Sequence, residues 1–471
     1  MFDVPRVRGL YASLSDGWTY LNAQDFPQVP ERVSSAVARS FRVASLLEPL
    51  ESATGSHSRA QRPGRRIGES FGDSARIAIA DLTGARPENV VLGASRAALL
   101  DNLAHALYRR LRLGQEVVLS RIDDPANVAP WKTAADLYGA RVRWAEPDLS
   151  SGVLPAWQFA NLVEHETSVV AVSAANRYVG AVTDVRAIAD CVRAKSRALL
   201  VVDVDSFAPY RVVDVEQMGA DVLALDVASL GGPSVGALVF KDDATRQAIF
   251  RSGHGVGVGG VSEGLLGGVS EAVDHLARLD DFARGTRRSR LKTGLPQAAE
   301  HLKTLAAHLV EGLQSLGTVH VIGVDGDGDV LEEFASVDRI PRVSFLVDGV
   351  PAGVVVQRLL ANGVVAGVVA PGQSQLLERM GVFEEHAPQS QHAQRTEQAA
   401  NARRGRHGRN AGANPATSAG SSALHTANAT GTASTSLGSS LDQAGAVAVG
   451  FAPHNTIHDV DQLVRVVASV R

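Results

Sequence analysis

The sequence contains a single cysteine, Cys191, and no long apolar run. One cysteine excludes an intramolecular disulfide framework, and this usage is typical of reducing compartments. No window approaches the roughly 20 consecutive apolar residues that a membrane helix requires, and the first residues lack the apolar centre of a secretory leader. We therefore expect a soluble cytoplasmic protein.

The chain also lacks a marked excess of charge of either sign. It has 46 basic and 50 acidic residues, for a formal net charge of -4. A nucleic-acid-binding domain usually carries a concentrated basic surface, so nucleic-acid and membrane partners are not expected. The 14 histidines show no spacing typical of a metal site, and none is predicted.

Lysine is scarce as well. Only five of the basic residues are lysines: Lys132, Lys195, Lys241, Lys292 and Lys303. A Schiff base needs a lysine amine, so these five residues are the complete set of candidates for such chemistry.

Short apolar runs alternate with longer amphipathic segments from Val90 to Phe240, which is typical of an α/β fold with a largely parallel sheet. Seven strands are expected, beginning near Val90, Glu116, Ala140, Ser168, Ala198, Asp221 and Val235. Four helices are expected between them, over Ser95 to Arg112, Pro125 to Tyr138, Pro155 to Glu164 and Asp184 to Ala194. The last two strands are too close in sequence for a helical crossover, which predicts that they are antiparallel neighbours.

The remaining sequence predicts a smaller α+β domain after a long helix over Arg287 to Leu316. Residues 385–440 have few large apolar side chains and are rich in small and polar ones, which predicts a disordered insertion. The expected organisation is an N-terminal segment (1–30), a large domain (31–286), a small domain (287–384 and 441–471) and the insertion (385–440).

Several motifs in this order resemble a known family. The stretch ADVLALDVASLGGPSVGALVF runs from an apolar strand to Gly232 and Pro233, and VVLGASRAALLDNL, SRIDDPANVAPW and LLVVDVDSF precede it. Together they resemble the class V aminotransferase and cysteine desulfurase-like family of pyridoxal-phosphate proteins, most of all its actinobacterial cysteine desulfurase-like branch. The resemblance implies the fold type I architecture, with a mixed seven-stranded sheet, a smaller C-terminal domain and a homodimer.

In that family a lysine three residues before the Gly-Pro pair forms the Schiff base with pyridoxal phosphate. Counting back from Gly232 places Ser229 at this position. A hydroxyl cannot form an imine, so no catalytic residue is assigned here.

The resemblance also implies a set of cofactor-binding positions. The phosphate-binding turn falls on Ser95, Arg96 and Ala97, where backbone N–H groups can hold an anion. The positions that stack on the ring, pair with its nitrogen, contact its oxygen and hold its phosphate fall, in that order, on Asp124, Asp203, Ser206 and Asp226. Asp124 and Asp226 add negative charge where an anionic cofactor would lie, which argues against tight binding, although Arg96 or Arg177 could offset it.

The substrate positions are altered too. The family's substrate-loop asparagine falls on Arg177, with Asn176 next to it. The arginine that binds the substrate carboxylate falls on Ala448, and the desulfurase cysteine has no counterpart near Ala370.

Three readings of the function stay open from the sequence. In the first, the protein has lost Schiff-base catalysis and acts as a ligand-binding or regulatory protein. In the second, an enzyme holds pyridoxal phosphate non-covalently against Asp203, or uses another phosphorylated ligand. In the third, an ordinary aminotransferase or lyase uses another lysine, such as Lys132 or Lys241.

Overall fold

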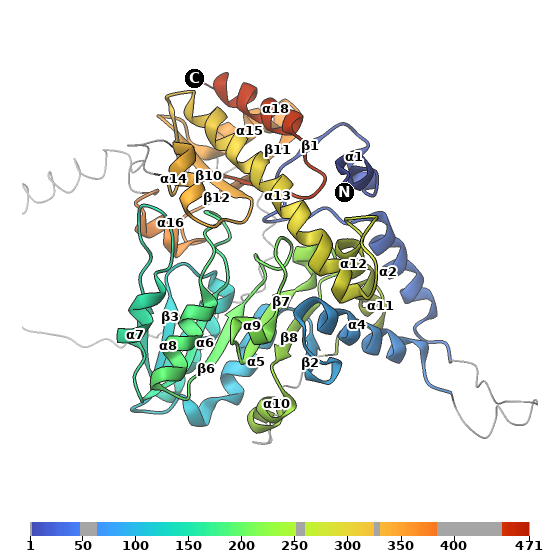
Figure 1. Ribbon diagram of the computed structural model, residues 1–471, viewed down its shortest axis with the longest axis vertical. Coiled ribbons are helices and arrows are strands. Elements are labelled where there is room, and N and C mark those ends of the chain that lie inside the picture. Colours follow the sequence, from blue (N-terminus) through green and yellow to red (C-terminus); the bar gives the residue numbers. More distant parts are fainter. Residues whose placement is uncertain (1, 48–63, 251–259, 325–329, 384–444, 471) are drawn as a thin grey trace, which may run out of the picture.

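The computed structural model describes residues 2–47, 64–250, 260–324, 330–383 and 445–470. The predicted insertion at 385–440 lies outside the described residues. A large sheet with helices on both faces forms one part of the molecule, and a smaller sheet with its own helices forms the other (Figure 1).

The large sheet has seven strands in the order β2-β8-β7-β6-β5-β3-β4. Strand β8 is antiparallel to both of its neighbours, and the other pairs are parallel. This confirms the mixed sheet and the antiparallel pair that the sequence predicted. The strands are β2 Val90–Gly93, β3 Glu116–Ser120, β4 Arg141–Ala145, β5 Thr167–Ser173, β6 Leu199–Asp203, β7 Val222–Asp226 and β8 Gly236–Phe240.

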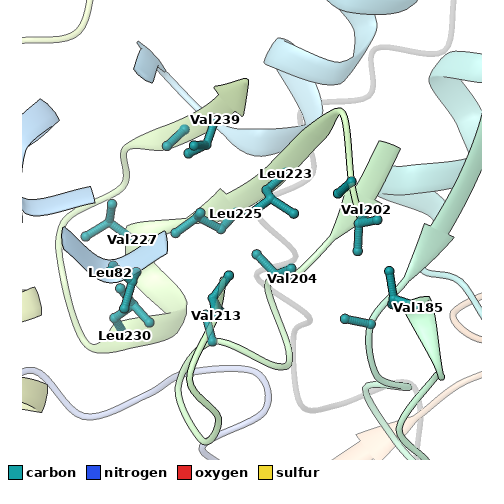
Figure 2. Packing of buried hydrophobic residues seen from close by; sticks show 14 of the residues in the cluster. Leu82, Val185, Val202, Val204, Val213, Leu223, Leu225, Val227, Leu230 and Val239 are labelled. Atoms are coloured by element: carbon teal, nitrogen blue, oxygen red, sulfur yellow. The ribbon is translucent and has the colours of Figure 1, made fainter. Parts of the chain in front are cut away.

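Apolar residues on both sides of each central strand bury the sheet on both faces. Adjacent residues such as Val201 and Val202 point to opposite faces and join different core clusters. Figure 2 shows Val202 and Leu223 in the cluster on one face. The helices packed on that face include α4 Ile67–Thr83, α8 Val185–Lys195, α12 Val269–Ala277 and the start of α13 Arg287–Gln314. The other face carries α5 Arg96–Ala106, α6 Pro125–Tyr138 and α10 Asp243–Phe250.

The smaller part is built on a four-stranded sheet in the order β12-β13-β10-β9. Its strands are β9 Val319–Val321, β10 Arg342–Val347, β12 Gly367–Val369 and β13 Ala446–Gly450. Its apolar core includes residues of α13, α15 Ala352–Ala361 and α18 Ile457–Ala468, and α13 runs diagonally from the large sheet to this part (Figure 1). Thr456 and Asp459 form a capping box that starts α18.

The N-terminal segment joins the smaller part through β1 Thr19–Tyr20. This strand pairs in parallel with β11 Val364–Val365. The apolar run GVVAGVV divides into β11 and β12, which belong to different sheets. The remaining helices are α1 Val4–Arg8, α2 Glu31–Val43, α7 Phe159–Leu162, α9 Val215–Met218, α11 Glu263–Leu266, α14 Val330–Ser336 and α16 Gln375–Arg379. Short 3₁₀ helices are η1 Ala12–Leu14, η2 Pro87–Asn89, η3 Tyr108–Arg110, η4 Ala156–Gln158 and η5 Val227–Leu230.

Across the described ranges, no helix has both the length and the apolar character needed to cross a membrane.

The topology brings several chain ends to one edge of the large sheet. Strands β6 and β7 are parallel neighbours that end at Asp203 and Asp226, and β3 ends just before Asp123 and Asp124. In open α/β sheets, ligands bind at the carboxyl ends of the strands. This edge therefore positions the candidate site.

Candidate functional site

Arg96 lies at the centre of the site. It is the first residue of α5, whose N-cap Ser95 accepts a hydrogen bond from the Ala98 N–H at 3.2 Å. The Arg96 side chain is only 6% exposed, and its guanidinium donates to Asp203 Oδ2. Three more carboxylates lie within 4 Å of the guanidinium: Asp124 at 3.6 Å, Asp205 at 3.7 Å and Asp226 at 3.9 Å.

Both carboxylate oxygens of Asp203 are engaged. Oδ2 accepts from Arg96, and Oδ1 accepts from the Asp205 backbone N–H at 3.0 Å. Burial raises the pKa of Asp203, and the attraction of Arg96 opposes that rise. The carboxylate that the sequence assigned to a ring nitrogen is thus paired with a guanidinium of the same chain.

Asp226 faces the N-terminus of α5. Its Oδ1 accepts a hydrogen bond from the Arg96 backbone N–H at 2.7 Å. Its own backbone N–H donates to Asp205 Oδ1 at 2.8 Å, which fixes the end of β7 beside that helix. A helix N-terminus attracts negative charge, and here the Asp226 carboxylate supplies it. Burial raises the pKa of Asp226 as well, with Arg96 opposing.

A second arginine extends the network. Arg177 Nη2 lies 3.1 Å from Asp25 Oδ1, and its Nη1 lies 3.7 Å from Asp124 Oδ2. Two guanidiniums and five carboxylates therefore share one small region. Arg96 and Arg177 do offset the negative charge of Asp124, as the sequence analysis anticipated.

Asn176, next to Arg177, is 2% exposed, and its amide is used within the loop. Its Nδ2 donates to the Ile122 carbonyl at 2.7 Å, and its Oδ1 accepts from the Tyr178 and Val179 N–H groups at 2.9 and 2.8 Å. These contacts give Asn176 a positioning role in shaping the loop that carries Arg177.

Ser229 lies in η5, immediately after β7. Its hydroxyl donates to the Asp226 carbonyl at 2.7 Å, so it closes a local turn. Ser206 is half-buried in the turn after β6, and Ala97 is exposed on the first turn of α5. The structure brings Arg96, Asp124, Asp203, Asp226 and Arg177 together in direct contact, whereas Ser95 serves as a helix cap.

The five lysines lie in the described part of the chain, and Lys195, Lys241 and Lys292 contact residues outside this network. Lys241 Nζ donates to Asp221 Oδ1 at 2.6 Å, at the opposite end of β7 from Asp226. The other four are Lys195, which donates to the Ala160 carbonyl, Lys292, whose Nζ lies 4.0 Å from Asp214 Oδ2, and Lys132 and Lys303, exposed on α6 and α13.

Four charged residues of this region were missed by the sequence analysis: Asp25, Asp123, Asp205 and Arg342. Burial raises the pKa of Asp123 to about 7, against hydrogen bonds that include one from the Ser173 N–H at 2.8 Å. Asp205 was detectable as the second acid of the DVDS motif, two residues after Asp203. Asp25 carried no comparable signal, because the N-terminal segment reaches the site through tertiary contacts with β11, β13 and Arg342, which are distant in sequence.

Arg342 is a buried cation at the start of β10. It is 4% exposed, and its guanidinium donates to Gln24 Oε1 and to the Ala23 carbonyl, each at 3.3 Å. Burial lowers its pKa. An arginine at the start of the otherwise apolar run RVSFLV was the signal that could have revealed it. Ala448, the position that the resemblance assigned to a substrate-binding arginine, lies opposite Ser344 on this same strand.

A small cavity of about 30 Å³ is lined in part by Ser229, Tyr11, Tyr210, His275 and His454. The Tyr11 hydroxyl and His275 Nε2 are 2.7 Å apart. His454 is fully buried, and within the described residues neither of its ring nitrogens has a hydrogen-bond partner. Burial lowers the pKa of His275 to about 4 and that of His454 to about 3. The space can hold a water molecule, which a neutral histidine can bind.

Comparisons with known proteins agree on the family. The family model described as aminotransferase class-V matches residues 44–272. The chain is 40% identical to the uncharacterized protein MT3887 of Mycobacterium tuberculosis, over 81% of this chain and 92% of that protein. It is 27% identical to a protein of Aeropyrum pernix named as a probable cysteine desulfurase, over 70% of this chain and 80% of that one. The crystal structure of the cysteine desulfurase CsdA from Escherichia coli has the same fold, with a TM-score of 0.70 and 17% identity, over 99% of this chain and 98% of that one.

Proposed function

The chain belongs to the class V aminotransferase family, and from this premise we propose that it is a member without Schiff-base chemistry that acts as a ligand-binding or regulatory protein. Family membership makes pyridoxal phosphate a possible ligand, so the proposal depends on the residues at the site.

The observation that carries the proposal is the position of Ser229 relative to the lysines. Ser229 follows β7 at the point where the family places its reactive amine, and its hydroxyl closes a turn onto the Asp226 carbonyl. Lys241, the nearest lysine in sequence, is separated from Ser229 by the length of β8. Five residues of extended strand span about 16 Å, which is beyond the reach of a lysine side chain that is itself paired with Asp221.

The contacts of Asp203 argue against non-covalent binding of pyridoxal phosphate. A protonated ring nitrogen would have to compete with Arg96 and the Asp205 N–H, which already donate to the two oxygens of this carboxylate, and would lie against the positive charge of the Arg96 guanidinium. The residues present therefore do not fit the cofactor.

A homodimer in a reducing, cytoplasmic setting is part of the same proposal. The lone cysteine, Cys191, is half-buried and free, which fits a reducing compartment. A stretch of exposed apolar side chains near α2 offers a surface for a second copy of the chain.

Reductive trapping tests the loss of Schiff-base chemistry. The full-length protein is incubated with pyridoxal phosphate, reduced with borohydride and measured by intact mass and peptide mapping. We expect only low, scattered labelling of exposed lysines such as Lys132 and Lys303. One adduct per chain at a single lysine would overturn the proposal and favour an enzyme that uses another amine.

A further inference from the structure

We infer that two side chains of this protein occupy the family's cofactor site. The Arg96 guanidinium pairs with Asp203, and the Asp226 carboxylate fills the anion site at the N-terminus of α5. This inference rests on the proposed function, since it concerns the same site, but it concerns non-covalent binding of phosphorylated ligands and not the Schiff base. It predicts which side chains keep phosphorylated ligands out.

At the N-terminus of α5, where the family would bind the phosphate, the Asp226 carboxylate takes the place of an anion. Asp226 Oδ1 accepts from the first N–H of α5 at 2.7 Å, the type of group that binds phosphate at other helix N-termini. The Asp226 backbone is in turn held by Asp205 at 2.8 Å. A phosphate could reach this N–H only by displacing a carboxylate that carries the same sign of charge.

Beside Asp203, where the family would place the protonated ring nitrogen, the Arg96 guanidinium takes the place of that cation. The Arg96 side chain is 6% exposed and the Asp203 side chain 2% exposed, and the two form a direct ion pair. Guanidinium is a permanent cation with donors that match a carboxylate, so it can satisfy Asp203 where a protonated ring nitrogen would in the family.

One residue links the two ends, because Arg96 contributes its backbone N–H to Asp226 and its side chain to Asp203. Asp124 and Asp205 add two more carboxylates within 4 Å of the guanidinium. A buried carboxylate needs a paired cation, and a buried cation needs carboxylates. We therefore expect these residues to act as a mutually dependent set.

The packing of α5 leaves little room for adjustment. A Cβ atom built on Gly236 of β8 would lie 2.2 Å from the Ser95 carbonyl carbon and 2.4 Å from the Arg96 nitrogen. The strand and the start of the helix are in direct backbone contact, so the helix cannot shift toward β8 to admit a phosphate beside Asp226.

The experiment measures non-covalent binding of pyridoxal phosphate to the full-length protein by equilibrium dialysis without reductant. The first variant is Asp226→Ser, which frees the helix N–H and keeps the Arg96–Asp203 pair. The second is Arg96→Ala/Asp226→Ser, which removes both the Asp226 carboxylate and the Arg96 guanidinium. Arg193→Ala is the matched control, because Arg193 forms a 2.7 Å pair with Asp221 at the opposite end of the same strands.

We expect weak binding by the unchanged protein and by Arg193→Ala. Asp226→Ser should bind pyridoxal phosphate at least about tenfold more tightly, and the double variant should bind more tightly still. Inorganic phosphate should compete with pyridoxal phosphate in both variants, which would locate the ligand at the helix N-terminus.

Two outcomes would overturn the inference. One is tight phosphate-competed binding by the unchanged protein, and the other is no gain in affinity in Asp226→Ser. Neither depends on whether a lysine can be trapped, so this test can fail while the loss of Schiff-base chemistry stands. If the double variant does not fold, the Asp226→Ser result decides, because that variant retains the buried ion pair.

Discussion

Burial controls the protonation of two histidines beside Ser229. The folded protein lowers the pKa of His275 to about 4 and that of His454 to about 3, whereas an exposed histidine titrates near 6.5. The unfolded chain therefore binds these protons more readily than the folded one. Their contribution to stability is complete above about pH 6.5 and is lost as the pH falls below it.

His454→Phe should reduce the acid sensitivity of the fold. From its pKa, His454 accounts for a loss of about 2 kcal/mol in unfolding free energy between pH 7 and pH 5, and phenylalanine cannot be protonated. Urea unfolding at both pH values measures the difference. His165→Phe is the control for the loss of an imidazole, because His165 is exposed, so the comparison isolates the effect of burial.

An unchanged pH dependence in His454→Phe would contradict the assignment of the acid sensitivity to this residue. The comparison between variants is needed because Asp123 acts in the opposite direction. Its pKa is raised to about 7, so its contribution is largest at low pH and is lost as the pH rises from about 4 through 7.

The candidate site was predicted from the residue types at positions that the family resemblance assigns. The absence of lysine at Ser229 and the extra acids Asp124 and Asp226 were visible in the sequence. The direction of the Arg96 side chain was not, because a sequence motif places a residue on a turn without stating where its long side chain ends. Asp25 and Arg342 were missed for a similar reason, since each reaches the region from a distant segment.

At the scale of elements, the contact between β8 and the start of α5 shapes the site. β8 is antiparallel to both neighbours, so its first residue, Gly236, lies opposite Asp226 and also opposite Gly93 on β2. This places the N-terminus of α5 next to the end of β7. The antiparallel strand is therefore part of what brings Asp226 to the helix.

Gly236→Ala should destabilise the protein by about 1–3 kcal/mol, the usual cost of an extra methyl group in a filled space. The added Cβ would lie 2.2 Å from the Ser95 carbonyl carbon and 2.6 Å from its oxygen, and the backbone cannot rotate away as a flexible side chain can. Urea unfolding measures the loss. Gly260→Ala is the control, because a Cβ there meets nothing within 4 Å and should change stability by less than about 0.5 kcal/mol.

A Gly236→Ala variant as stable as the control would contradict the close packing of strand and helix.

The helices and strands themselves were well predicted where the apolar pattern was strong. α6 spans Pro125–Tyr138 as expected, and the seven strands lie at their predicted places. The helix expected over Pro155 to Glu164 is shorter, as η4 followed by α7, because Val163 is already extended.

At the scale of the whole molecule, several large apolar side chains near the N-terminus are exposed. Phe26 is 68% exposed, Phe41 55%, Leu46 53% and Leu47 56%. α2, which carries Phe41, lies at the margin of the molecule (Figure 1). Large exposed apolar groups close together in sequence favour association between copies.

We expect the protein to be a dimer in size-exclusion chromatography with light scattering. Phe26→Glu combined with Leu46→Glu should shift it toward the monomer, because charge on an apolar interface opposes association. Trp157→Glu is the control, since Trp157 is equally exposed, at 71%, but lies in η4 on the large sheet's flank. A monomeric unchanged protein would contradict the dimer.

Removal of residues 385–440 should leave the melting temperature nearly unchanged. The composition of this stretch gives it little apolar surface to bury, and the core of the smaller part is already formed by α13, α15, α18 and its sheet. Thermal unfolding followed by circular dichroism measures the change. A large drop would mean that the stretch packs on the folded part.

The sequence by itself determined the α/β architecture, the antiparallel last strand and the missing amine, since these follow from apolar periodicity, loop length and residue identity. Only the tertiary structure decided that Arg96 pairs with Asp203 while its backbone N–H holds Asp226. That outcome depends on three chain segments converging at one sheet edge, and on burial, which makes one another and nearby backbone N–H groups the partners of these charges.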